Sequence, residues 1–194
     1  MYPEQQRISQ RRLTSYDYTK PGAYFVTICI HERLSLLGAI ANNKAALSLA
    51  GEMISFWWLN MQKKFEPFIK MDTFIVMPDH IHGIIWITDD HPDPHPVGAD
   101  RCVCPHQGFS EGRHIGRPLR QTAPSIPRVI QWFKTMTTNT YIHGVKHHSW
   151  QPFNKTLWQR NYYDRIIRNE SELIATRNYV LDNPRRWQER RPLG

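Results

Sequence analysis

Residues 73–87, TFIVMPDHIHGIIWI, decide the predicted fold. Two apolar runs rich in β-branched and aromatic residues flank Met77-Pro78-Asp79. Proline cannot donate to a central β-ladder and aspartate favours turns, so this tripeptide is typical of a tight turn. The stretch therefore predicts two strands joined by a turn, the second beginning near His80.

The second run opens with His80 and His82 on either side of Ile81. Successive side chains on a strand point to opposite faces, so the two imidazoles should point the same way. Two imidazoles side by side make half of a metal site. The alternative is a pair of histidines satisfied by hydrogen bonds near a strand end, and the spacing alone leaves both open.

Composition limits the class of protein. A chain of 194 residues with 40% hydrophobic residues can bury the core of one folded domain, predicted to span 1–194. The formal charge of +8 favours a polyanionic partner, with nucleic acid ahead of an anionic membrane surface. No apolar run of about 18 residues is present, and the N-terminus lacks the apolar core of a signal peptide. We therefore expect a soluble cytoplasmic protein, with no disulfide framework around the isolated Cys29.

Hydrophobic periodicity predicts the other elements. The near-continuous apolarity of 23–30 is typical of a central strand, and 34–40 could form a short second strand. Recurrence at three and four residues predicts a helix over 46–65, and residues 68–77 form the strand before the turn. Ser125 and Pro127 begin another helix.

Two segments have weaker signals. Residues 1–20 form either a solvated tail or a basic arm in which Arg7, Arg11 and Arg12 touch phosphates. Residues 89–124 are punctuated by prolines and glycines and are best interpreted as an insertion loop. The alternative for this insertion is a zinc knuckle, because thiolates and imidazoles suit zinc. Its candidate ligands are Cys102, Cys104, His106 and His114.

The stretch 157–168, LWQRNYYDRIIR, predicts a helix that Asn161 caps, with Asp164 at its positive end. On that helix Tyr163 faces the packed side, three and four residues before Ile166 and Ile167. Tyr162 is left at the helix start, where arginines and backbone N–H groups can gather a phosphate. A second helix should start near Asn169, with Glu172 as its capping partner, and end at Asn183-Pro184. The tail from 185 is basic.

Several of these pieces together resemble the HUH-type single-tyrosine transposases, and within them the REP-associated tyrosine transposases. The matching segments run in family order from near the start of the chain to near its end. They are YDY at 16–18 with GAYFVTI at 22–28, VMPDHIHG at 76–83, WQRNYYDRIIR at 158–168, and YVLDNP at 179–184. The combination of a His-hydrophobic-His pair with the Trp-Gln-x-x-Tyr start is the specific part of the match.

The resemblance implies an α+β fold: a central antiparallel sheet with helices on one face, similar to the ferredoxin-like RNA-recognition fold. It implies cleavage and rejoining of single-stranded or hairpin DNA through a 5′-phosphotyrosine intermediate. His80 and His82 would hold Mg²⁺ or Mn²⁺, and Tyr162 matches the nucleophile. No third metal ligand is evident, since Asp164 points elsewhere on a regular helix; water or DNA could complete the sphere.

The same resemblance suggests which cations meet DNA and in what assembly. Relatives are monomers or homodimers, and a protein bound to chromosomal DNA would be associated with the nucleoid. Two other functions stay open: a hairpin-binding protein that has lost its chemistry, and a metal-dependent hydrolase of RNA or nucleotides. The predicted phosphate contacts are Arg7, Arg11, Arg12, Arg160, Arg165, Arg168, Arg185 and Arg186.

Overall fold

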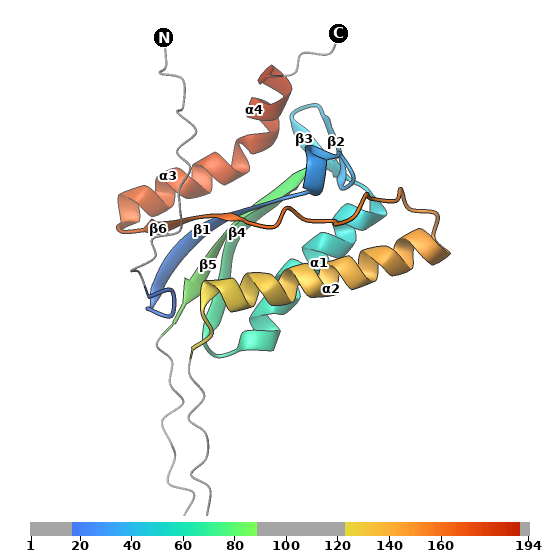
Figure 1. The fold of residues 1–194 in the computed structure, drawn as a ribbon. Coiled ribbons are helices and arrows are strands. Elements are labelled where there is room, and N and C mark those ends of the chain that lie inside the picture. The colour runs from blue at the N-terminus through green and yellow to red at the C-terminus, as the bar shows by residue number, and fades with distance from the viewer. Residues whose placement is uncertain (1–16, 89–122, 191–194) are drawn as a thin grey trace, which may run out of the picture.

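The computed structural model describes residues 17–88 and 123–190 of the chain (Figure 1). Arg7, Arg11 and Arg12 lie outside the described residues, as do nearly all of the predicted insertion and its four candidate zinc ligands. The predictions made for those residues therefore stay predictions.

A four-stranded antiparallel sheet lies at the centre, in the order β4-β5-β1-β6. Its strands are β1 (Gly22–Cys29), β4 (Ile69–Met77), β5 (His80–Ile87) and β6 (Tyr163–Ile167). The predicted turn is confirmed, because β4 and β5 pair across it with Met77 opposite His80. The predicted α+β class with a central antiparallel sheet is confirmed as well.

Two helices, α1 (Leu49–Phe65) and α2 (Ile126–His147), pack on one face of the sheet (Figure 1). The side chain of Ser48 caps α1 by accepting a hydrogen bond from the backbone N–H of Gly51. Trp58 of α1 is fully buried against the sheet, and a Cβ built on Gly83 would lie 2.2 Å from its ring. The glycine after His82 therefore lets the largest core side chain reach β5 closely.

The opposite face carries α3 (Glu170–Leu181), with α4 (Asn183–Arg190) continuing from it towards the hairpin of β2 (Gly38–Ala41) and β3 (Lys44–Leu47) (Figure 1). The expectation of helices on one face is therefore wrong. The physical reason is a second apolar cluster on that face, where Ala23, Ile84 and Ile167 pack against Leu173 of α3. The predicted cap of α3 is confirmed, since Asn169 Oδ1 accepts a hydrogen bond from the N–H of Glu172 at 2.8 Å.

The helix predicted to begin at Asn161 is also wrong, because Tyr163–Ile167 is strand β6. Its residues pair with the edge of β1, Thr27 opposite Tyr163 and Ala23 opposite Ile167. Tyr163 is 55% exposed, whereas the helical reading placed it on the packed face. Pairing with β1 outweighs the local capping signal, as tertiary context commonly does.

The remaining elements are the 3₁₀ turn η1 (His31–Arg33) and the two-stranded hairpin of β2 (Gly38–Ala41) and β3 (Lys44–Leu47). The short strand expected within 34–40 thus begins only at Gly38. Cys29 is buried and makes no disulfide within the described residues. In the same parts of the chain, no helix combines the length and apolarity needed to cross a bilayer.

Candidate functional site

His80 and His82 lie at the start of β5 and point to the same face of the sheet, the one that carries α3 and α4. Both side chains are buried, and their Nε2 atoms are 3.0 Å apart. The predicted juxtaposition is therefore present. It follows directly from the two-residue alternation of a strand.

The Nδ1 atom of each histidine has a partner that fixes the orientation of the ring. His82 Nδ1 lies 2.7 Å from Thr27 Oγ1 of the neighbouring β1, and His80 Nδ1 lies 2.5 Å from Asp79 Oδ1. An ionised carboxylate can only accept, so the contact with Asp79 engages Nδ1 of His80 as a donor and leaves Nε2 turned towards His82. Contacts of this kind from a carboxylate or a hydroxyl are what orients histidine ligands around a metal.

His82 is held neutral. Burial lowers the pKa of His82 well below its ordinary value, and the neighbouring His80 and Arg33 lower it further. A metal ligand has to be the neutral imidazole, so this environment keeps His82 ready to coordinate.

The pair fits a divalent metal. Two ligands on one ion, with bonds of about 2.1 Å at roughly a right angle, stand about 3.0 Å apart, which is the spacing observed. Within the described ranges no group of three or more His, Cys, Asp or Glu side chains could hold the ion. A third donor from the described residues would therefore have to be of another kind, and the buried Asn183 lines the same pocket.

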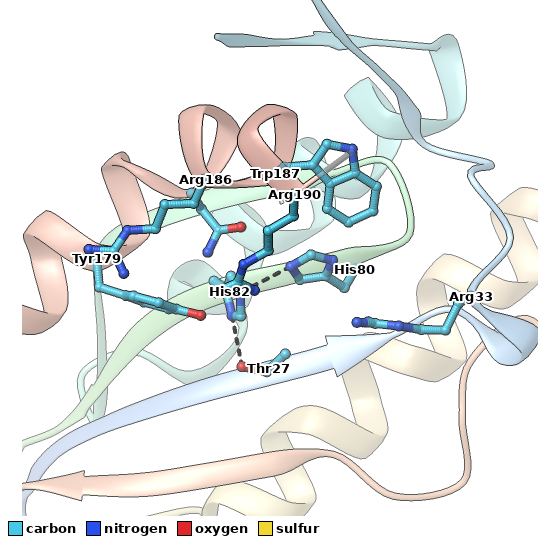
Figure 2. A pocket seen from close by; sticks show the side chains of 9 residues that line it. Thr27, Arg33, His80, His82, Tyr179, Arg186, Trp187 and Arg190 are labelled. Carbon is cyan, nitrogen blue, oxygen red and sulfur yellow. Dashed lines mark hydrogen bonds between the residues drawn. The ribbon is translucent and has the colours of Figure 1, made fainter. Parts of the chain in front are cut away.

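Of the tyrosines that the structure describes, Tyr179 is the one whose ring lies against the histidine pair. It projects from α3, and its ring lies 5.5 Å from the His82 ring and 6.0 Å from the ring of Phe25. The guanidinium of Arg186 lies over the Tyr179 ring, 5.3 Å from its centroid. Figure 2 shows the Tyr179 hydroxyl turned towards the two imidazoles. Sequence reasoning gave Tyr179 no role, although it opens the YVLDNP segment that contributes to the family resemblance.

These side chains enclose a cavity of about 240 Å³ between the sheet and the α3–α4 segment (Figure 2). Among the residues that the structure describes, three arginines and no carboxylate line it, so the cavity is suited to a phosphate. Its lining residues are Thr27, Arg33, His80, His82, Tyr179, Asn183, Arg186, Trp187 and Arg190.

Tyr162, the predicted nucleophile, does not lie at this site. In the β1–β6 register, Tyr163 is opposite Thr27, whose side chain faces His82. Tyr162 precedes Tyr163, so its side chain points to the opposite face of the sheet. The Tyr162 ring packs against the core under α1 and α2, with Lys134 Nζ 5.7 Å from its centroid. The structural premise of that assignment is therefore wrong: Tyr162 begins no helix and faces the other side of the sheet.

The predicted arginines that the structure describes fall into two groups: one of them lines the cavity and the other four do not. Arg160, Arg165 and Arg168 do not line the cavity, and Arg165 instead contacts Glu172 and Thr176. Arg186 does line it and also pairs with Asp182, whereas Arg185 does not line it and pairs with Asp182 and Glu189. The cavity arginines that the sequence did not single out are Arg33 and Arg190.

Comparison with known proteins places this fold. No protein-family model matches the chain. An uncharacterized protein of Haemophilus influenzae is 32% identical over 181 residues, covering 92% of this chain and 88% of that protein. The solved structure of a REP-associated tyrosine transposase bound to a REP hairpin superposes with a TM-score of 0.53. That match has 16% identity and covers 89% of this chain and 72% of the transposase chain, so it establishes the fold. The chain therefore belongs to the same family as the Haemophilus influenzae protein, and its fold is that of the REP-associated tyrosine transposases.

Proposed function

We propose that this protein cleaves and rejoins single-stranded DNA, with Tyr179 as the nucleophile and a divalent metal at His80 and His82. The observation that carries the proposal is the position of Tyr179. Its ring packs against His82 in a cavity that also holds three guanidinium groups. A phenol, two converging imidazoles and a cluster of cations are the parts that a phosphoryl transfer to tyrosine requires.

The chemistry is a pair of displacements. The Tyr179 oxygen attacks the scissile phosphorus, the bond from phosphorus to the 3′ oxygen breaks, and a 5′-phosphotyrosine link forms. The phenol loses a proton and the departing 3′ oxygen gains one, so the step is balanced. A 3′-hydroxyl can then attack the phosphotyrosine, and no external energy is needed because the link keeps the free energy of the phosphodiester.

His80 and His82 would hold the metal through their Nε2 atoms, and the side-chain oxygen of Asn183 would be the third protein donor. Mg²⁺ and Mn²⁺ both accept mixed nitrogen and oxygen ligands, and imidazoles favour Mn²⁺. The bound ion would polarise a phosphoryl oxygen and offset developing negative charge. Asn183 lies four residues after Tyr179, so one turn of chain brings nucleophile and donor to the same side.

Hairpin DNA is the proposed substrate. The solved transposase of the same fold is bound to a REP hairpin. The formal charge of +8 on this chain and the arginines of its cavity supply the matching electrostatics. Acting on chromosomal DNA would place the protein with the nucleoid in the cytoplasm.

A second candidate is a hairpin-binding protein without chemistry. It is favoured by the ligand set, since the described residues offer no third His, Cys, Asp or Glu beside the histidine pair. An amide oxygen binds a divalent ion more weakly than a carboxylate, and a weakly held metal would leave the tyrosine without electrostatic support.

The deciding experiment incubates the full chain with Mn²⁺ and single-stranded DNA that carries candidate palindromes and a label at its 3′ end. A denaturing gel then separates free DNA from covalent protein–DNA adduct, with His82→Ala as the matched inactive variant. A retarded labelled band that His82→Ala lacks is the expected result. Tight binding without an adduct would support the binding protein, and shortened DNA released without an adduct would support a hydrolase.

A further inference from the structure

Arg33 stands on the sheet side of the cavity, across the histidine pair from Tyr179. It lies in η1, directly after β1, and its side chain is 48% exposed. In Figure 2 the Arg33 guanidinium and the Tyr179 hydroxyl approach the histidines from opposite sides. The other two arginines of the cavity, Arg186 and Arg190, belong to α4, so Arg33 is the cation that the sheet side contributes.

The backbone that presents Arg33 is strained. Glu32 and Arg33 have φ angles of 56° and 57°, a region that residues with a side chain rarely occupy. Such conformations persist only where the surrounding structure holds them, and they concentrate at functional sites. Two consecutive examples here aim one guanidinium into the cavity.

The Arg33 side chain is placed by two groups under the site. Its Nε lies 3.3 Å from Oδ2 of the fully buried Asp79, and its Nη1 donates to Cys29 Sγ at 2.9 Å. The other carboxylate oxygen of Asp79 holds His80. One buried carboxylate thus fixes the position of Arg33 relative to the histidine pair.

Within the described part of the chain, most of the N–H donors of Arg33 have no partner and can bind a ligand. A guanidinium has five N–H donors, and a thiol is only a weak acceptor. Asp79 Oδ2 accepts no well-directed hydrogen bond in the described part of the chain, so its contact with Arg33 is an ion pair alone. The guanidinium is anchored, and its planar fork still faces the cavity.

We propose that Arg33 is a catalytic residue that binds a non-bridging oxygen of the scissile phosphate. The inference deepens the proposed function and rests on it for the identity of the reaction. As the Tyr179 oxygen bonds to phosphorus and the 3′ oxygen leaves, negative charge spreads over the equatorial oxygens. The guanidinium of Arg33 stabilises that charge with preorganised donors.

The test compares wild type with Arg33→Ala and Arg33→Lys, and Lys146→Ala on the exposed end of α2 is the control. Single-turnover adduct formation is measured on a normal strand and on one with a methylphosphonate at the scissile position, which removes the charged oxygen. We expect Arg33→Ala to slow the normal reaction about 10²- to 10³-fold, as loss of one preorganised donor does elsewhere. On the methylphosphonate strand, the rate of Arg33→Ala should be less than about tenfold below that of wild type. On the normal strand, the rate of Arg33→Lys should lie between those of wild type and Arg33→Ala, because lysine is charged but lacks the planar fork.

Mn²⁺ affinity is measured on the same variants by titration, because Arg33 also contacts Asp79. Unchanged Mn²⁺ affinity together with methylphosphonate rescue supports a phosphate contact. An equal defect on both strands, or loss of Mn²⁺ affinity in Arg33→Ala, would show that Arg33 only braces Asp79, and the proposal would be overturned.

A binding measurement separates this inference from the proposed function. In a Tyr179→Phe background, a methylphosphonate is moved one position at a time along the bound strand. Arg33 should make the protein prefer phosphate at one position, and Arg33→Ala should lose that preference. If the wild-type protein forms no adduct but shows this preference, the proposed cleavage reaction is refuted and the contact between Arg33 and a phosphate is supported. If the preference is absent, the contact is refuted.

Discussion

The ring of Tyr179 lies 5.5 Å from the ring of His82, with their planes inclined by 64°. The two residues come from separate elements, Tyr179 from α3 and His82 from β5. Their contact is possible because α3 crosses the sheet face on which the histidines lie (Figure 1). The helix is held there by Arg177, whose guanidinium makes two hydrogen bonds to Asp72 of β4.

The first prediction concerns the nucleophile. Tyr179→Phe removes the phenol oxygen and should abolish the covalent adduct, a loss of at least about 10³-fold, as removal of a nucleophile does in other covalent enzymes. Tyr162→Phe should keep the adduct because its ring packs in the core on the other face of the sheet. Tyr163→Phe should keep it as well. Denaturing gels with 3′-labelled DNA measure all three variants.

Hairpin affinity is the control for these variants, and it should stay within about threefold of wild type for Tyr179→Phe. An adduct that survives in Tyr179→Phe and disappears in Tyr162→Phe would restore the assignment made from sequence and refute the one made from the fold.

Most of the fold could be predicted because its signals are local. The strand alternation within 73–87 identified β4, β5 and the shared face of His80 and His82. Periodic apolar positions identified α1 and α2. These patterns depend only on neighbours along the chain, so they hold without knowledge of the topology.

The tyrosine could not be predicted in the same way. The stretch after Asn161 has a helix-capping pattern, yet the open edge of β1 takes it as a strand. That pairing moves Tyr162 away from the histidines and leaves α3 as the helix over them. Which helix crosses which face is decided by contacts between distant segments, such as Leu173 against Ile84, and capping patterns contain no information about them.

A second prediction follows from the hydrogen bond between Thr27 and His82. Thr27→Val keeps the shape of the side chain but removes the hydroxyl that lies 2.7 Å from His82 Nδ1. The imidazole then loses its fixed orientation, and Mn²⁺ affinity should fall about 10- to 100-fold. Isothermal titration measures the affinity. Thr27→Ser, which retains the hydroxyl, should bind Mn²⁺ nearly as wild type; equal affinity in all three proteins would exclude a role for the hydroxyl.

A third prediction concerns the arginines that meet DNA. Arg186→Ala should weaken hairpin binding and lower the slope of log K against log salt by about one, because one phosphate contact is lost. Arg128→Ala, an exposed arginine of α2 on the face of the sheet away from the cavity, is the matched variant and should leave the slope unchanged. Fluorescence anisotropy at several salt concentrations gives both slopes. Identical slopes for the two variants would place the DNA elsewhere on the surface.

The last prediction concerns the contact that holds α3 to the sheet. Asp72 receives two hydrogen bonds from Arg177 and one from Trp86, and the Arg177 guanidinium above all lowers the pKa of Asp72 below its ordinary value of 3.8. A carboxyl whose pKa is lower in the folded state stabilises that state above its ordinary pKa, and the contribution is lost as the pH falls towards the folded value. Asp72→Asn should therefore lower the urea midpoint at pH 7 and at pH 5, and the difference from wild type should shrink below about pH 3.8.

Glu170→Gln is the matched control for Asp72→Asn. Its carboxylate is 3.9 Å from Nη1 of Arg177 and 71% exposed, so the ion pair is screened by solvent and its removal should change the midpoint little. A difference between wild type and Asp72→Asn that stays constant from pH 7 to pH 3 would show that the charge of Asp72 does not hold α3. Hydrogen exchange of the α3 amides at pH 7 gives a second measure, since loosening α3 in Asp72→Asn should speed exchange there before it does in α1.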